Sequence, residues 1–207
     1  FQPSQDRPYV EIMVNYLHSN HHYLECSTQS QTECLNDSVL AHDLPAMADV
    51  DSSMLYFCSS VRPFCKVALT GECADEIFGG YPWFHRKDCF HAHTFPWTMD
   101  LKARQVLLSD EFLAELKMED YVNNAYEASL AQVPRLPGEP EEEARRREIS
   151  YLNLRWFMQT LLNRMDRTSM YSGLEARVPF ADHRIIEYLW NVPWEMKALN
   201  GREKGLL

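Results

Sequence analysis

The chain has 207 residues, 45% of them hydrophobic and 12% aromatic, so it can bury one core and forms one domain or a large piece of one. Its formal net charge of −10 at pH 7 and its pI near 5.2 disfavour a nucleic-acid-binding surface, which is normally basic. No apolar run approaches the roughly 18 residues that a membrane span needs, so we expect neither a nucleic acid nor a membrane as partner.

The six cysteines form no C-x-x-C pair and no dense framework, and no signal peptide is apparent. This pattern favours reduced thiols and a cytoplasmic location. The chain begins at Phe1 instead of Met and stops at Leu207, where a helix seems to start. We therefore expect a piece of a longer protein.

The first half of the chain alternates helix and strand signals. Asp6 and Pro8 predict a helix start, and apolar residues at helical spacing continue it to about His18. A strand is expected over 21–26, helices over 32–41 and 49–61, and a short buried strand over 67–69. The side chains expected to face inward from these two helices are Leu35, Val39, Leu40, Val50, Met54, Phe57 and Val61. This order of elements predicts an α/β layer.

The second half is predicted to be mainly helical. Helices are expected over 101–108, from a cap at Ser109 to about Val133, and from Glu141 to just before Gly173, with a proline-rich connection over 134–140. The side chains expected to face inward from the last of these helices are Ile149, Leu152, Trp156, Leu161 and Met165. In the third helix three glutamates precede three arginines by four residues, which predicts three ion pairs. An extended piece over 175–180 and a helix capped by Asp182 follow.

Two groups of histidines invite a metal interpretation, His18 with His21 and His22, and His85, His91 and His93 with Cys89. Neither group has the spacing common at zinc sites. We favour solvated or supporting roles for both groups.

The segment 66–81 concentrates residues that carry chemistry. A strand over 67–69, the Thr70-Gly71 turn and a helix over 73–78 that Gly79-Gly80 ends together form an anion site, because free N–H groups and the helix dipole point at the end of the strand. Three carboxylates in this turn are explained if Mg²⁺ lies between them and a phosphate. The alternative, which the residues alone favour, is that acidic side chains merely offset the helix dipole.

Three motifs resemble those of the glutamine-hydrolysing asparagine synthetases. Residues 70–81 resemble S-G-E-G-A-D-E-L-F-G-G-Y, residues 164–183 resemble D-R-x-S-M followed by L-E-x-R-V-P-F-L-D-H, and residues 203–207 resemble E-K-x-L-L. The motifs occur in the order that the family has. The chain thus resembles the C-terminal synthetase domain of that family, truncated at both ends.

The resemblance implies a fold and an activity. The fold is an α/β fragment of an adenine-nucleotide alpha-hydrolase-like (ATP pyrophosphatase) domain, with few parallel strands over 1–93 and a mainly helical part over 94–207. In this family ATP adenylates the aspartate side chain with release of pyrophosphate, and ammonia made from glutamine by an N-terminal domain displaces AMP. The resemblance further implies Mg²⁺ as cofactor, and a homodimer is one possible assembly.

The resemblance also implies roles for individual residues. Glu72 and Lys204 match catalytic positions, and Thr70, Gly71, Asp75 and Lys204 match positions that contact ATP or pyrophosphate, with Asp75 as the Mg²⁺ ligand. The positions that match the lining of the substrate pocket are Glu76, Asp166, Arg167, Glu175 and Arg177.

Several departures limit the match. Thr70 keeps the hydroxyl of the usual serine, Ala181 replaces a leucine, and Cys73 replaces a glycine and is expected to crowd or alter the turn. A reactive Cys73 thiol at the helix start is the alternative for that residue. The family's S-G-G-x-D-S phosphate loop and its glutaminase domain are absent from these 207 residues.

Without the phosphate loop, we expect the isolated fragment to be inactive. Without the first strands of a parallel sheet, we also expect exposed apolar edges, with self-association or poor stability. Two other functions stay open, a related ligase that closes a β-lactam or amidates a peptide, and a non-catalytic binding module.

Overall fold

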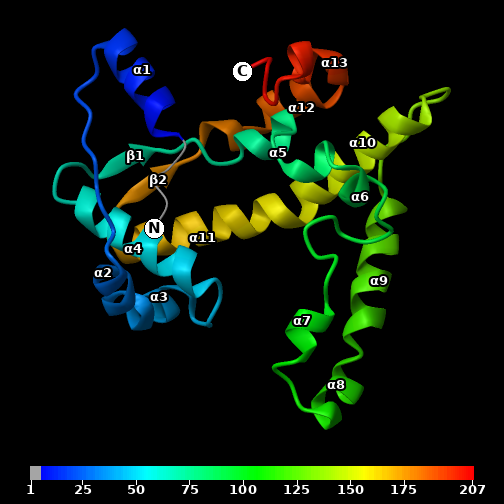
Figure 1. The fold of residues 1–207 in the computed structure, drawn as a ribbon, viewed down its shortest axis with the longest axis horizontal. Coiled ribbons are helices and arrows are strands. Elements are labelled where there is room, and N and C mark those ends of the chain that lie inside the picture. Colours follow the sequence, from blue (N-terminus) through cyan, green and yellow to red (C-terminus); the bar gives the residue numbers. More distant parts are fainter. Residues whose placement is uncertain (1–5) are drawn as a thin grey trace.

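The computed structural model describes residues 6–207, so the chain start at Phe1 lies outside the described residues. It is an α/β structure with two parallel strands and many helices. In Figure 1 helices α1 to α4 and the sheet lie on one side, helices α6 to α9 lie on the other, and the long helix α11 runs between them. No helix within residues 6–207 is long and apolar enough to cross a membrane.

The first helix agrees with the prediction, but the strand expected after it is wrong. Helix α1 (Arg7–Leu17) ends at His18, which adopts a left-handed conformation with φ 51°, and none of its residues is buried. Residues 21–26 are irregular and mostly exposed. No described strand lies beside them, and an unpaired strand would leave a row of backbone N–H and C=O groups without partners.

Two helices replace the one expected over 32–41, namely α2 (Thr28–Glu33) and α3 (Leu35–His42). The early start follows from Ser27, whose hydroxyl accepts a hydrogen bond from Ser30 N. Helix α4 (Ala48–Val61) is confirmed within one residue.

The inward faces predicted for α3 and α4 are confirmed only in part. Leu35, Val50, Met54 and Val61 are half-buried, but Val39, Leu40 and Phe57 are exposed. The fully buried side chains in these helices are Ser38, Ala41, Asp51, Ser52, Leu55 and Cys58. Small and polar side chains face inward because α3 and α4 pack against α11 through polar contacts. In one such contact His42 Nε2 lies 3.0 Å from Thr168 Oγ1.

The sheet pairs β1 (Val67–Leu69) in parallel with β2 (Glu175–Arg177), with Ala68 opposite Ala176. Thr70 N donates to Arg177 O at 2.9 Å, which extends the pairing to the end of β1. The strand expected to be buried is instead open, since Leu69 is 74% exposed. The second strand confirms the extended piece expected over 175–180, which follows the helices of the second part of the chain. The sheet therefore joins both parts of the chain, and the division near residue 93 stays a prediction.

Helix α5 (Ala74–Phe78) holds the turn after β1 against the rest of the molecule. Its Ala74, Ile77 and Phe78 form an apolar cluster with Leu189 of α12 (His183–Trp190). Helix α12 has the predicted cap, because the Asp182 side chain accepts from Arg184 N. A 3-10 turn (Pro179–Ala181) precedes α12. Helix α13 (Trp194–Lys197) and a second 3-10 turn (Leu199–Gly201) follow it.

The long helix is built from α10 (Glu141–Leu152), a π-helical segment (Asn153–Phe157) and α11 (Met158–Tyr171). Ile149, Leu152 and Met165 are buried, which confirms three of its predicted inward residues. The helix ends at Tyr171, just before Gly173 as predicted.

Three of the remaining helices are shorter than predicted, namely α7 (Lys102–Gln105), α8 (Asp110–Leu116) and α9 (Met118–Leu130). Helix α6 (Lys87–Phe90) was not predicted. The cap at Ser109 is confirmed, but the helix expected from there to Val133 is divided at Lys117, which has φ 46°. The aromatic segment after Gly80 packs as expected, with Phe84 buried beside Phe90 and Ile149.

Only one of the three ion pairs predicted in α10 forms, between Glu142 and Arg146. Arg145 instead donates to the carbonyls of Phe90 and Ala92, each at 2.7 Å. Arg147 pairs with Glu139 at 2.7 Å. Neighbouring segments thus offer these arginines acceptors that helical spacing alone does not reveal.

Candidate active site

The turn after β1 brings the predicted site residues to the start of α5. Thr70 Oγ1 accepts a hydrogen bond from Glu72 N at 3.3 Å, which tightens the turn. Cys73 then adopts a left-handed conformation with φ 72°, a region that favours glycine. This backbone demand explains why the resembling motif has glycine at the position of Cys73.

The alternative of a reactive Cys73 thiol is wrong. The side chain is buried, and burial, with the nearby Glu76 and Glu72, raises the pKa of the thiol to about 12. A thiol that stays protonated at neutral pH is a poor nucleophile. Cys73 therefore fills space in the turn.

Glu72 pairs with Arg164, which projects from α11. Arg164 Nη2 lies 3.1 Å from Glu72 Oε1, and both side chains are less than one-fifth exposed, at 15% and 17%. Glu72 Oε2 and Arg164 Nε are buried without a hydrogen-bond partner among the described residues. The pair therefore retains one acceptor and one donor for a ligand.

Asp75 pairs with Lys204, as the resemblance implies for two residues that both contact pyrophosphate. Lys204 Nζ lies 2.8 Å from Asp75 Oδ1, and both side chains are about one-third exposed. The backbone N–H groups of Gly79 and Gly80 both donate to Asp75 O. A Cβ at Gly80 would lie 1.9 Å from Asp75 Oδ1, so the ion pair requires glycine there.

Glu76 lies deeper and faces Tyr81. The glutamate is 2% exposed, and its Oε1 accepts a hydrogen bond of 2.7 Å from the Tyr81 hydroxyl. Burial raises the pKa of Glu76, and the Tyr81 hydrogen bond partly opposes that shift. Burial and the same contact raise the pKa of Tyr81. Glu76 Oε2 is buried and unpartnered within residues 6–207.

The other predicted site residues do not contact this cluster. Glu175 and Arg177 pair with each other at 2.8 Å on exposed β2. Arg167 donates to Asp43 Oδ2 at 2.6 Å, on the side of α3, and Asp166 is exposed. Gly71 has open space where a Cβ would stand. Roles for these residues in a substrate pocket stay predictions.

Sequence reasoning missed two partners of the carboxylates. Arg164 was interpreted as a helix-end cation and Tyr81 as part of an aromatic packing cluster. The available signal for Tyr81 was its spacing of five residues from Glu76 across a glycine turn. Arg164 had no comparable local signal, because its contact with Glu72 depends on the packing of α11 against the sheet.

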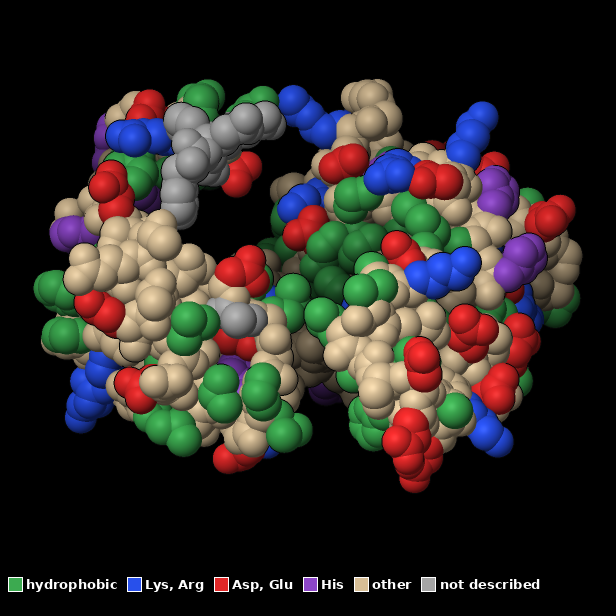
Figure 2. All heavy atoms as spheres, turned by 60° about the horizontal axis from the view of Figure 1, so that its bottom comes forward, with side chains coloured by type: hydrophobic (Ala, Val, Ile, Leu, Met, Phe, Trp, Pro, Cys, Tyr) green, Lys and Arg blue, Asp and Glu red, His purple; other side chains and the backbone are tan. Residues whose placement is uncertain are grey.

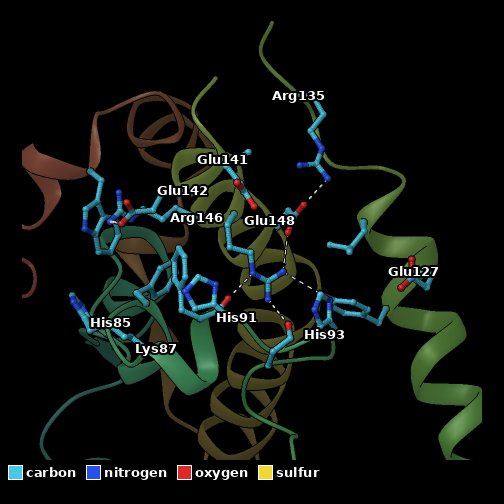
Figure 3. Close-up of a pocket in the computed structure, with 18 residues that line it drawn as sticks. His85, Lys87, His91, His93, Glu127, Arg135, Glu141, Glu142, Arg146 and Glu148 are labelled. Atoms are coloured by element: carbon cyan, nitrogen blue, oxygen red, sulfur yellow. Dashed lines mark hydrogen bonds and ion pairs between the residues drawn. The ribbon is translucent and has the colours of Figure 1, made fainter. Parts of the chain in front are cut away.

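The largest pocket lies elsewhere, between α6, α9 and α10, and has a volume of about 1070 Å³. In Figure 3 charged side chains of both signs surround it, and Arg135 pairs with Glu148 at 2.6 Å. His85, His91 and His93 line it, yet the described residues contain no group of three or more potential ligands that could hold a metal. Figure 2 shows a separate hollow between the two halves of the molecule.

A parallel β-strand, a tight turn and a short helix together present three carboxylates, two of them with a buried oxygen that has no partner within residues 6–207. This arrangement defines an α/β protein with a charged site at a strand end. The family model described as asparagine synthase matches residues 1–207, and the chain belongs to this family. That result confirms the predicted family.

Curated relatives support the assignment. Asparagine synthetase [glutamine-hydrolyzing] 3 of Bacillus subtilis is 50% identical over 207 residues, all of this chain and 33% of the relative. Asparagine synthetase [glutamine-hydrolyzing] of Mesocricetus auratus is 25% identical over 211 residues, which cover this chain and 28% of that protein. The chain thus spans about a third of the length of such relatives.

Proposed function

We propose that this chain supplies part of the synthetase site of a glutamine-dependent asparagine synthetase. The reaction is the ATP-dependent amidation of aspartate through a β-aspartyl adenylate, with pyrophosphate as product and ammonia from glutamine as nitrogen source. The observation that carries the proposal is the pairing of Asp75 with Lys204 beside the Glu72–Arg164 pair. Glu72 and Asp75 lie in one turn, and Arg164 and Lys204 reach it from two other segments of the chain.

Each pair suits a different part of the reaction. Lys204 is a partly exposed cation that can turn from Asp75 to the negative charge that develops as pyrophosphate leaves. Glu72 Oε2 has no hydrogen-bond partner within residues 6–207 and can accept a proton or a hydrogen bond from the attacking ammonia. Arg164 would fix the orientation of Glu72.

The residues fit a Mg²⁺ ion only as partial ligands. Mg²⁺ is usually held by one or two carboxylates together with phosphate and water oxygens. Asp75 is the carboxylate that would hold it, since its side chain is about one-third exposed. When bound, the ion would offset the negative charge of the phosphates.

The test is aspartate-dependent exchange of pyrophosphate into ATP, measured on the full-length protein. Exchange that requires aspartate and collapses in both Glu72→Ala and Lys204→Ala would support the proposal. Exchange with another carboxylate would move the assignment to a related ligase. An intact, folded protein without exchange for any carboxylate would favour a binding module.

A further inference from the structure

A second, smaller pocket lies between α10 and the connection from α12 to α13. Its volume is about 70 Å³, and its charged lining consists of Glu143, Arg146, Arg147 and Lys197. Ser150 adds a hydroxyl from α10. The α12–α13 connection contributes no charged lining residue before Lys197, so positive charge prevails in the lining.

Lys197 is the unusual member of this lining. The residue is 8% exposed, and its side-chain amine forms no hydrogen bond or ion pair with any residue that the structure describes. Burial and the nearby Arg147 lower the pKa of its amine to about 8, while Glu143 acts in the opposite direction. A buried ammonium group that no carboxylate contacts directly is costly, so this position favours an anion.

The two arginines are already held in place. Arg146 pairs with Glu142 and Glu143 and lies 4.8 Å from the ring centre of Trp194. Arg147 pairs with Glu139 and lies 5.4 Å from the ring centre of Trp190. Both guanidinium groups are therefore ordered before a ligand binds, so binding would not cost the conformational entropy of immobilising them.

The volume sets the size of the ligand. A water molecule needs about 10–15 Å³ of such space, so the pocket holds about five atom-sized positions. That number fits a tetrahedral oxyanion and is far below the roughly 300 Å³ of pockets for larger organic ligands. We propose that this pocket binds one small oxyanion, the size of sulfate or inorganic phosphate, against Lys197, Arg146 and Arg147.

The experiment uses sulfate, because its double negative charge does not change between neutral and alkaline pH. Calorimetric titration of the full-length protein should give one saturable site at neutral pH. Affinity should fall by up to about tenfold per pH unit above a pH of about 8, as the amine of Lys197 loses its proton.

Variants place the site. Lys197→Met should weaken sulfate binding by at least about tenfold, and Lys197→Arg should restore part of it. Lys102→Met, on exposed α7, should leave the titration unchanged. Binding that survives Lys197→Met or disappears in Lys102→Met would overturn the proposal.

The wild-type protein gives an independent readout if Lys197→Met does not fold. Sulfate should slow modification of Lys197 by an amine-specific acylating reagent at least about tenfold, measured by peptide mass spectrometry, without protecting Lys102. Equal modification with and without sulfate would refute the site. So would affinity that rises with pH and needs bicarbonate, because that result indicates a carbamate on the amine.

Discussion

The turn after β1 and the start of α10 both gather charges, but they satisfy them differently. In the turn each carboxylate has one side-chain partner, which is Arg164, Lys204 or Tyr81. In α10 a single arginine, Arg145, uses all three of its nitrogens on four acceptors. The turn keeps two buried carboxylate oxygens, on Glu72 and Glu76, without a hydrogen-bond partner within residues 6–207. Arg145, by contrast, uses every side-chain nitrogen to hold segments together.

The difference indicates which charges serve chemistry and which serve the fold. A buried carboxylate oxygen without a partner costs stability, and native structures retain such groups mainly at functional sites. Arg145 instead joins α10 to its neighbours. It donates to the carbonyls of Phe90 in α6 and of Ala92 just after α6, and to the hydroxyl of Tyr126 in α9. Mutations in the two regions should therefore separate activity from stability.

The largest effect should come from Lys204→Met in the full-length protein. Loss of the cation should lower aspartate-dependent ATP–pyrophosphate exchange by about 10²–10³-fold, as for other groups that stabilise charge in a transition state. The free energy of unfolding should change by less than about 1 kcal/mol, because the pair with Asp75 is partly exposed. Lys102→Met is the matched control, and a similar loss of exchange in that variant would contradict the assignment.

Arg145→Met should have the opposite profile. Removing a buried arginine with four acceptors should lower the free energy of unfolding by about 3–5 kcal/mol, measured by urea denaturation. Arg104→Met, on exposed α7, should change it by less than about 0.5 kcal/mol. Equal stability of the two variants would remove the contrast between the regions.

Gly80→Ala tests the geometry of the turn without removing a charge. The new methyl group would overlap Asp75 Oδ1 and displace it from Lys204, so exchange should fall by about 10–100-fold. Gly138→Ala is the control, since nothing stands within 4 Å of its Cβ position, although its φ of +74° adds local strain. Unchanged exchange in Gly80→Ala would show that the Asp75–Lys204 pair is dispensable.

The smallest effect should appear in the pH dependence of stability. Because burial raises the pKa of Glu76 in the folded state, wild-type stability should fall as the pH rises above the ordinary value of 4.5 and through the folded pKa. Glu76→Gln lacks this loss and should be more stable at neutral pH, by about 1 kcal/mol. The advantage should vanish in acid, and an advantage that grows in acid would reverse the assigned direction.

Local patterns were sufficient for several elements. The run over 67–69, the glycines after Phe78 and the Asp182 cap each determine their structure through a few neighbouring residues. The pairing of Asp75 with Lys204 was accessible only through resemblance to a family, because no local rule joins a turn to the end of the chain.

Other features depend on tertiary packing, which a single sequence does not reveal. The apolar periodicity of α4 placed Phe57 inside, yet Asp51 and Ser52 are buried because polar neighbours receive them. Glu72 pairs with Arg164, which lies on a helix far away in the sequence. In α10, Arg145 and Arg147 do not pair with the expected glutamates, because Arg145 donates to carbonyl groups and Arg147 pairs with Glu139.

The π-helical segment over 153–157 gives the long helix a fixed phase. Such a segment accommodates one residue more than an α-helix does, because about five of its residues turn the chain through nearly the angle of about four α-helical residues. Deleting one residue there would therefore restore regular α-helix and leave Arg164, which follows the segment, facing Glu72. Deleting a residue from the regular helix between Arg145 and Arg164 would instead rotate Arg164 by about 100°, away from Glu72. The long helix can thus lose a residue at this turn without uncoupling the two arginines from their partners.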